Sequence, residues 1–256
     1  MKVTFLGVGE ACDETKPNTS IWVQTTAGDR TVSVMLDCGF TAPSLYWQRA
    51  RDQEDLDALW ISHFHGDHFF GVPALLLRFW EMKRQKPLVI LGQTGIEALI
   101  RQAMELAYPR FMPKLMYPLN FITVEPADHP LDVVGLHWRF AENGHGQRDL
   151  AVRLEDGSRS VFYSGDGLPT QQTLALARGC DLVIHEAFRL DGTTPGHGTV
   201  LECIDFARKA GAQGLALVHL QRNERRERHG EILKCLEEVR DLHTSLPEPG
   251  DEIELS

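Results

Sequence analysis

Short hydrophobic runs separated by polar or glycine-rich turns dominate the first quarter of the chain. Their composition and spacing predict strands over residues 3–6, 21–25, 32–36 and 58–62. The spacing of apolar positions then lengthens, which predicts a helix over residues 71–85, a strand over 88–91 and a helix over 94–106. Strands and helices are therefore expected to alternate from this point.

The second half repeats this order, with strands first and helices later. Strand-like runs cover residues 121–124, 136–140, 151–154 and 160–163, with a hairpin turn at residues 156–158. Helices over 170–177, 199–210 and 230–242 then alternate with strands over 182–184 and 215–218. Two strand-rich halves, each followed by helices, predict an α/β four-layer αββα sandwich. We expect two mixed sheets with helices on the outside, in one domain of residues 1–256.

Residues 108–118 interrupt this pattern with three prolines and many apolar side chains. Proline-rich segments of this kind favour an ordered loop over regular structure. The loop could pack on the core, or it could serve as a lid or a dimer contact. The last two alternatives depend on an exposed apolar patch formed by Phe111, Met112, Met116 and Tyr117.

Composition narrows the functional classes. A formal net charge of -10 argues against a broad basic surface for nucleic acid, although it leaves room for a local cationic pocket. Five scattered cysteines without a Cys-x-x-Cys pair argue against a disulfide framework or a thiolate zinc site, and favour a reducing cytoplasm. The N-terminus resembles a first strand more than a signal peptide, and no apolar run approaches the length of a membrane span.

The candidate chemistry begins directly after the strand predicted at residues 58–62. His63 and His65 alternate as on an extended segment, so their side chains point the same way and can share one metal ion. Gly66 turns the chain, after which Asp67 and His68 can reach a second metal ion. Imidazole and carboxylate ligands favour zinc, with manganese or iron also compatible.

The pattern His63-x-His65-x-Asp67-His68 is similar to the signature of the metallo-β-lactamase superfamily. Further segments resemble its ribonuclease Z branch and the small phosphodiesterases related to that branch. These segments are residues 6–9, 18–20, 36–39, 61–77 and 185–187. The resemblance covers nearly the whole chain and implies a hydrolase with two divalent metal ions and a metal-bridging hydroxide.

The remaining ligands follow from this resemblance alone. His145 matches the third histidine, Asp166 the carboxylate that bridges the metals, and His219 the last ligand. The resemblance implies one metal held by His63, His65 and His145. It implies a second metal held by Asp67, His68 and His219, with Asp166 between the two and Asp67 also taking part in catalysis.

Four other residues have expected roles near the metals. His197 matches an extra histidine that ribonuclease Z-like enzymes place near the scissile phosphate, which predicts a general acid or phosphate stabiliser; simple capping of the following helix is the alternative. Gly198 departs from the Ser or Leu that relatives often carry after it. Asp37 is expected to hydrogen-bond a ligating imidazole or to be a turn residue, and His185 and Glu186 are expected to support the ligands from beneath.

The substrate is expected to be a small or nucleotide-like phosphodiester. In bacterial ribonuclease Z a protruding arm that grips transfer RNA is inserted between the third histidine and the bridging aspartate, but here His145 and Asp166 are only 21 positions apart. Transfer RNA 3′-end cleavage remains an alternative, as does thioester or lactone hydrolysis. A non-catalytic scaffold is disfavoured because every ligand position is occupied. Arg222 either places a cation at the rim of the site or lies on a solvated helix face.

Overall fold

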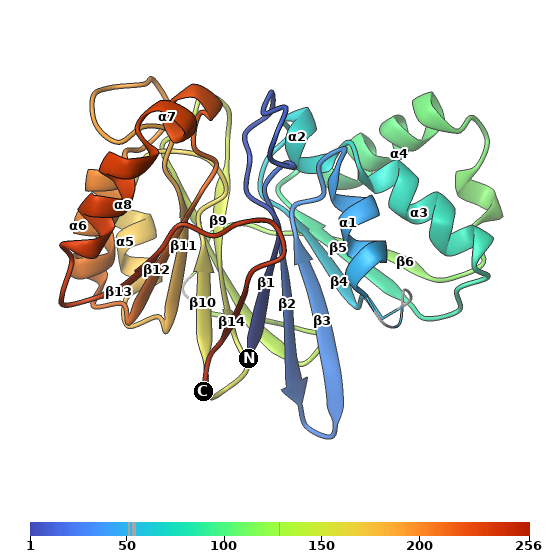
Figure 1. Ribbon diagram of the computed structural model, residues 1–256. Coiled ribbons are helices and arrows are strands. Elements are labelled where there is room, and N and C mark those ends of the chain that lie inside the picture. Colours follow the sequence, from blue (N-terminus) through green and yellow to red (C-terminus); the bar gives the residue numbers. More distant parts are fainter. Residues whose placement is uncertain (51, 53–54, 128) are drawn as a thin grey trace.

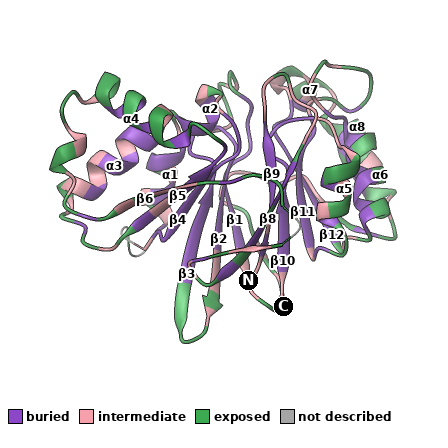
Figure 2. Ribbon diagram, turned by 180° about the vertical axis from the view of Figure 1, so that it is seen from behind, coloured by how far each residue is buried: buried purple, intermediate pink, exposed green. Residues whose placement is uncertain are grey.

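The computed structural model describes residues 1–50, 52, 55–127 and 129–256. Two seven-stranded sheets pack face to face, and helices cover the outer face of each sheet (Figure 1). The predicted αββα sandwich is therefore confirmed. Strands are buried through the middle of the molecule, whereas exposed positions gather on the outer helices and the loops (Figure 2).

The first sheet has the strand order β14-β1-β2-β3-β4-β5-β6. Its strands are β1 (Lys2–Gly7), β2 (Ser20–Ala27), β3 (Arg30–Leu36), β4 (Ala58–Ile61), β5 (Leu88–Gly92), β6 (Leu119–Thr123) and β14 (Glu252–Glu254). The pairs β3 to β6 are parallel, and β14, β1, β2 and β3 pair antiparallel. The sheet is therefore mixed, as expected.

The second sheet has the strand order β13-β12-β11-β10-β9-β8-β7. Its strands are β7 (Leu131–Val133), β8 (Leu136–Glu142), β9 (Leu150–Glu155), β10 (Ser160–Tyr163), β11 (Leu182–Glu186), β12 (Gly214–Val218) and β13 (His243–Ser245). Strands β10 to β13 are parallel. Asp156 closes the predicted β9–β10 hairpin, because its Oδ1 accepts the backbone N–H groups of Ser158 and Arg159.

Three hydrophobic layers hold these elements together. Trp60, Trp138 and Tyr163 lie in the layer between the two sheets. The other two layers lie beneath the outer helices. The helices are α1 (Ala42–Arg49), α2 (Gly66–Phe69), α3 (Val72–Glu81), α4 (Ile96–Ala107), the 3-10 turn η1 (Met112–Lys114), α5 (Gln171–Ala177), α6 (Val200–Ala210), α7 (Arg222–Glu227) and α8 (His229–Glu237).

Helix boundaries differ from the prediction where local backbone geometry intervenes. Helix α3 ends at Glu81, four residues earlier than expected, and Lys83 then adopts a left-handed backbone with φ of 59°. Helix α6 begins after Thr199, whose side chain forms a capping box with Glu202, and it ends at Ala210, directly before Gly211 with φ of 64°. Helix α1 and the three-residue strands β7, β13 and β14 were not predicted, because such short elements carry little periodicity.

Residues 108–118 pack against α3. Tyr117 is buried and its hydroxyl donates to the backbone oxygen of Leu76 at 3.2 Å, while the ring of Phe111 meets Trp80 edge-on with centroids 4.7 Å apart. The prediction of an exposed four-residue patch is wrong, because Tyr117 is buried and Phe111 and Met112 are half-buried. Met116 alone of the four is largely exposed.

Candidate metal centre

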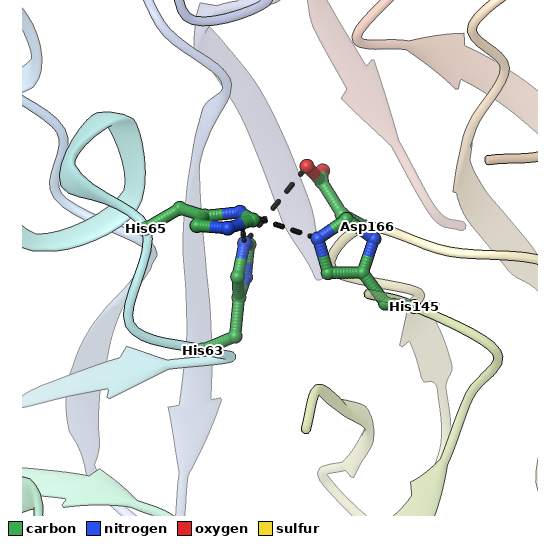
Figure 3. Close-up of side chains that lie close together, drawn as sticks. All are labelled: His63, His65, His145 and Asp166. Carbon is green, nitrogen blue, oxygen red and sulfur yellow. Dashed lines mark hydrogen bonds and ion pairs between the residues drawn. The ribbon is translucent and has the colours of Figure 1, made fainter. Parts of the chain in front are cut away.

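Three histidine side chains from two loops converge on one another (Figure 3). His63 and His65 follow β4, and His145 follows β8. The Nδ1 atom of His65 lies 2.9 Å from Nε2 of His63 and 3.2 Å from Nε2 of His145. A carboxylate oxygen of Asp166 completes this group, with all four ligand atoms within 4.8 Å of one another. The three histidines are called the first half-site below.

A second group lies beside the first. Asp67 and His68 are placed by the short helix α2, and His219 follows β12. The Nε2 atoms of His68 and His219 each lie 3.3 Å from Oδ2 of Asp67. These three residues, called the second half-site below, are all buried.

Asp166 lies between the two half-sites. Its Oδ2 atom is 3.3 Å from Nε2 of His219 and 3.9 Å from Nε2 of His63, while its Oδ1 atom is 3.5 Å from Nε2 of His68. Asp166 follows β10, so it comes from the carboxyl end of a central strand. The structure thus brings together all seven residues that the sequence predicts as metal ligands.

The donor set fits divalent cations. Facing imidazole nitrogens at about 3 Å repel one another unless a proton or a cation lies between them. Nε2 of His68 and Oδ1 of Asp166 are inaccessible to solvent and have no hydrogen-bond partner, although buried polar atoms normally have one. Nitrogen and oxygen ligands of this kind suit zinc.

The carboxylates of Asp67 and Asp166 favour a positive charge on the histidines of the second half-site. Burial opposes ionisation of Asp67 and Asp166, but the neighbouring histidines outweigh it and hold both pKa values well below the usual range. Burial likewise disfavours the charged form of His219, yet Asp166 and Asp67 raise its pKa to about 9. The pKa of His68 is raised in the same way, chiefly by Asp166 and Asp37.

The first half-site has the opposite tendency. Burial, together with repulsion from His63 and His145, lowers the pKa of His65 to about 4. Burial also lowers the pKa of His145. At neutral pH the imidazoles of His65 and His145 are therefore uncharged and offer lone pairs, which is the form that binds a metal ion.

Asp37 lies directly behind the second half-site. Its Oδ2 atom is 2.7 Å from Nδ1 of His68 and accepts the hydroxyls of Tyr163 at 2.7 Å and Ser62 at 2.8 Å. The backbone of Asp37 is left-handed, with φ of 60°, and so is that of His219, with φ of 59°. Such strain in residues other than glycine persists where the surroundings enforce it and often marks functional sites.

Asp149 lies directly behind the first half-site and was not predicted from the sequence. Its Oδ2 atom is 2.8 Å from Nδ1 of His63, and the carboxyl group is fully buried. A lone aspartate at the start of a strand carries no pattern that would have revealed it. Burial raises the pKa of this carboxyl group, and the contact with His63 opposes that rise.

His197 lies beside Asp166 and His219, with which it forms a third possible ligand group. Its ring stacks on Phe188 with centroids 4.5 Å apart, and its Nδ1 atom is 3.5 Å from Oε1 of Glu186. The capping alternative for His197 is wrong, because Thr199 caps α6. Burial lowers the pKa of His197, but the nearby Glu186 carboxylate outweighs this and raises it.

Glu186 and His185 diverge at the end of β11. Oε1 of Glu186 accepts the backbone N–H groups of Gly167 at 3.1 Å and Gly198 at 2.8 Å, so it joins the loops that carry Asp166 and His197. His185 instead packs against Phe206 on the helix side of the sheet. The expectation that His185 supports the ligands is wrong, because neighbouring residues on a strand point to opposite faces.

Arg222 begins α7 and is engaged by acidic residues. Its Nη1 atom lies 2.6 Å from Oε1 of Glu10, and its Nε atom lies 3.8 Å from Oε2 of Glu14. Arg222 is half-buried and its charge is balanced by these two carboxylates. It is therefore neither a free cation at the rim of the site nor part of a fully solvated helix face.

All five cysteines are unpaired, and none of the described helices is both long enough and apolar enough to cross a membrane.

Comparison with known proteins places this site in a family. Residues 1–234 match the family described as anti-Pycsar protein Apyc1. A ribonuclease Z of Natronomonas pharaonis is 28% identical over 86% of this chain and 87% of its own length.

Two solved structures share the fold. The metallo-β-lactamase fold protein YhfI of Bacillus subtilis superposes with a TM-score of 0.80 at 26% identity, covering 99% of both chains. The short form of human tRNase Z superposes with a TM-score of 0.79 at 22% identity, covering 100% of both chains. The chain belongs to the anti-Pycsar protein Apyc1 family and to the ribonuclease Z-like branch of the metallo-β-lactamase superfamily.

Proposed function

We propose that this chain is a dinuclear metal-dependent phosphodiesterase that acts on a small or nucleotide-like phosphodiester. The observation that carries the proposal is the position of Asp166, whose two oxygens face Nε2 of His68 and Nε2 of His219 at 3.5 and 3.3 Å. One carboxylate shared by two ligand groups suits a pair of adjacent cations. Two divalent ions, zinc by preference, would acidify a water between them and neutralise charge on the phosphate.

The protein's own residues have distinct tasks in this proposal. The first half-site offers three imidazoles, and the second offers Asp67 with two imidazoles. Asp67 is ionised over the whole physiological range, so it can also accept a hydrogen bond from the attacking water. The loops that carry these residues extend from one single domain, which we propose spans residues 1–256.

His197 is the proposed acid or phosphate stabiliser. Its ring is half-buried beside the ligand cluster, and the Glu186 carboxylate favours its protonated form. A protonated imidazole at this place can donate a hydrogen bond to a phosphate oxygen or a proton to the leaving oxygen. The hydrogen bonds from the backbone N–H groups of Gly167 and Gly198 to Glu186 hold its carboxylate beside His197.

The short connection between the third histidine and the bridging aspartate favours a small substrate. The hairpin of β9 and β10 fills most of the interval between His145 and Asp166, leaving no room there for a protruding arm. The second candidate is transfer RNA 3′-end cleavage, which is supported by relatives named ribonuclease Z. The acidic net charge of -10 favours the small substrate.

Hydrolysis of bis(p-nitrophenyl) phosphate by metal-loaded protein tests the proposal, with metal content measured for each sample. Wild type should turn over, Asp166→Ala should lose both activity and metal, and His197→Ala should keep its metal while losing activity. Absence of turnover by protein that carries two metals would overturn the proposal and direct attention to thioester and lactone substrates. Cleavage of precursor transfer RNA in place of small phosphodiesters would favour the second candidate.

A further inference from the structure

Two buried aspartates lie on opposite sides of the metal-ligand cluster. Asp149 contacts a ligand of the first half-site, and Asp37 contacts a ligand of the second. Both carboxyl groups are fully buried and neither belongs to the seven candidate ligands. Each is therefore placed to act on a metal through neighbouring ligands and not as a ligand itself.

Asp149 is held by contacts to three segments that carry candidate ligands. Its Oδ2 atom faces Nδ1 of His63 at 2.8 Å and accepts the backbone N–H of Asp166 at 2.9 Å. Its Oδ1 atom accepts Nδ2 of Asn143 at 2.9 Å, two residues before His145. One side chain thus connects the segments that carry His63, His145 and Asp166.

The turn before Asp166 is shaped around this carboxylate. Gly165 has φ of 65°, and a Cβ atom there would lie 2.4 Å from Oδ1 and 2.8 Å from Oδ2 of Asp149. Only a glycine permits both this backbone conformation and this approach. The local sequence Gly165-Asp166 therefore depends on the presence of Asp149 as well as on the metal ligand itself.

We propose that Asp149 is a positioning residue that sets the metal affinity of the first half-site, and that Asp37 does the same separately for the second. This inference rests on the dinuclear centre proposed above. A carboxylate that accepts the Nδ1–H of an imidazole fixes Nε2 as the metal-binding nitrogen and makes it a better donor. Because Asp149 and Asp37 face different histidines, loss of either carboxylate should weaken chiefly the half-site whose histidine it contacts.

The Ser62 side chain lies between Asp37 and His63. Its hydroxyl donates to Asp37 and lies 3.0 Å from Nδ1 of His63. A hydroxyl that donates to Asp37 can only accept from His63, and it carries no charge. The carboxyl oxygen of Asp149, at 2.8 Å, is therefore the closer acceptor for His63.

The test is the metal content of Asp149→Asn and Asp37→Asn. Asparagine keeps a carbonyl acceptor at each place but removes the charge. We expect each variant to bind metal about 10–100-fold more weakly at one half-site and normally at the other. At a limiting free zinc concentration, each should retain close to one metal where wild type retains two.

Proton NMR of the Co²⁺-loaded protein identifies which half-site is lost. The ring N–H protons of His63, His68 and His145 each have an acceptor and should appear as separate, strongly shifted resonances. Asp149→Asn should lose those of His63 and His145 and keep that of His68. Asp37→Asn should show the reverse.

Asp57→Asn is the matched control, because Asp57 is also buried but bonds Arg30 and the backbone of Ser33 away from the cluster. It should keep both metals even if it unfolds at a lower temperature. Equal loss from both half-sites in Asp149→Asn, or no loss, would overturn the inference. If Asp149→Asn does not fold, the metal content and ring N–H resonances of Asp149→Ser are measured in its place, with the same expected results. Wild type that binds no metal would instead overturn the proposed function.

Discussion

Nδ1 of His145 lies 2.8 Å from the backbone oxygen of Gly196, so a ligand of the first half-site is hydrogen-bonded to the loop that carries His197. The two residues are 51 positions apart in the chain. This contact turns Nε2 of His145 toward His65 and ties the position of His197 to the metal centre. Substitution of Gly196 should therefore affect both.

Gly196→Ala is expected to reduce activity and zinc content together. Gly196 has φ of 77°, and an added Cβ would lie 3.0 Å from the backbone nitrogen of Gly146. The left-handed conformation costs alanine about 1–2 kcal/mol, and relief of this strain would pull the carbonyl away from His145. Gly192→Ala is the control, because Gly192 has φ of 81° but open space around it. Equal losses in both variants would contradict the proposed link.

Glu186→Gln should move the alkaline limb of the pH profile of kcat/KM to lower pH. The Glu186 carboxylate raises the pKa of His197, so the protonated imidazole persists to a higher pH than in the free side chain. Glutamine keeps an acceptor for Gly167 and Gly198 but removes the charge, which lowers the pKa of His197. A profile that does not move in fully metal-loaded Glu186→Gln would exclude His197 as the acid.

Thr199→Ala should lower the free energy of unfolding by about 1 kcal/mol without changing the zinc content. The Thr199 hydroxyl accepts the backbone N–H of Glu202 and forms the capping box of α6. His197→Ala removes no cap and should lower stability less. Denaturant unfolding of the two variants checks this, and a larger loss in His197→Ala would assign the cap to the histidine instead.

Zinc binding to the second half-site should strengthen between pH 7 and pH 9. His219, with a pKa of about 9, holds a proton at pH 7 that must leave before its nitrogen can bind a cation. Affinity should rise roughly tenfold per pH unit for each proton displaced, until the pH passes that pKa. His65, with a pKa of about 4, is already deprotonated, so the first half-site should change little.

Competition with a chelator at several pH values measures this difference. Metal-free protein should take up its first zinc with nearly constant affinity from pH 7 to pH 9, and its second with increasing affinity. Calorimetry in buffers of different ionisation enthalpy should detect proton release with the second zinc. Identical pH dependence for both zinc ions would contradict the assignment of protons to the second half-site.

The sequence was most informative where ligands are close together in the chain. His63, His65, Asp67 and His68 lie on one turn after β4, so spacing alone predicts that they share a site. His145, Asp166 and His219 are separated by whole strands, and only their order in a known family connects them. The alternation of side chains along β11 could have shown that His185 and Glu186 face opposite ways.

Other parts of the molecule depend on packing that no local pattern reveals. The role of Asp149 follows from its contact with His63, which lies 86 positions earlier and in the other sheet. Likewise, the sequence alone allows Tyr117 either in an exposed apolar patch or in the core. Its hydrogen bond to Leu76 and its burial against α3 follow from tertiary structure.

The most direct measurement is the rate of bis(p-nitrophenyl) phosphate hydrolysis as metal-free protein is titrated with zinc. If two ions act together across Asp166, activity should stay low up to one equivalent and rise between one and two. Asp166→Ala should show no rise at any zinc concentration. Full activity at one equivalent, or none at two bound equivalents, would contradict the dinuclear phosphodiesterase.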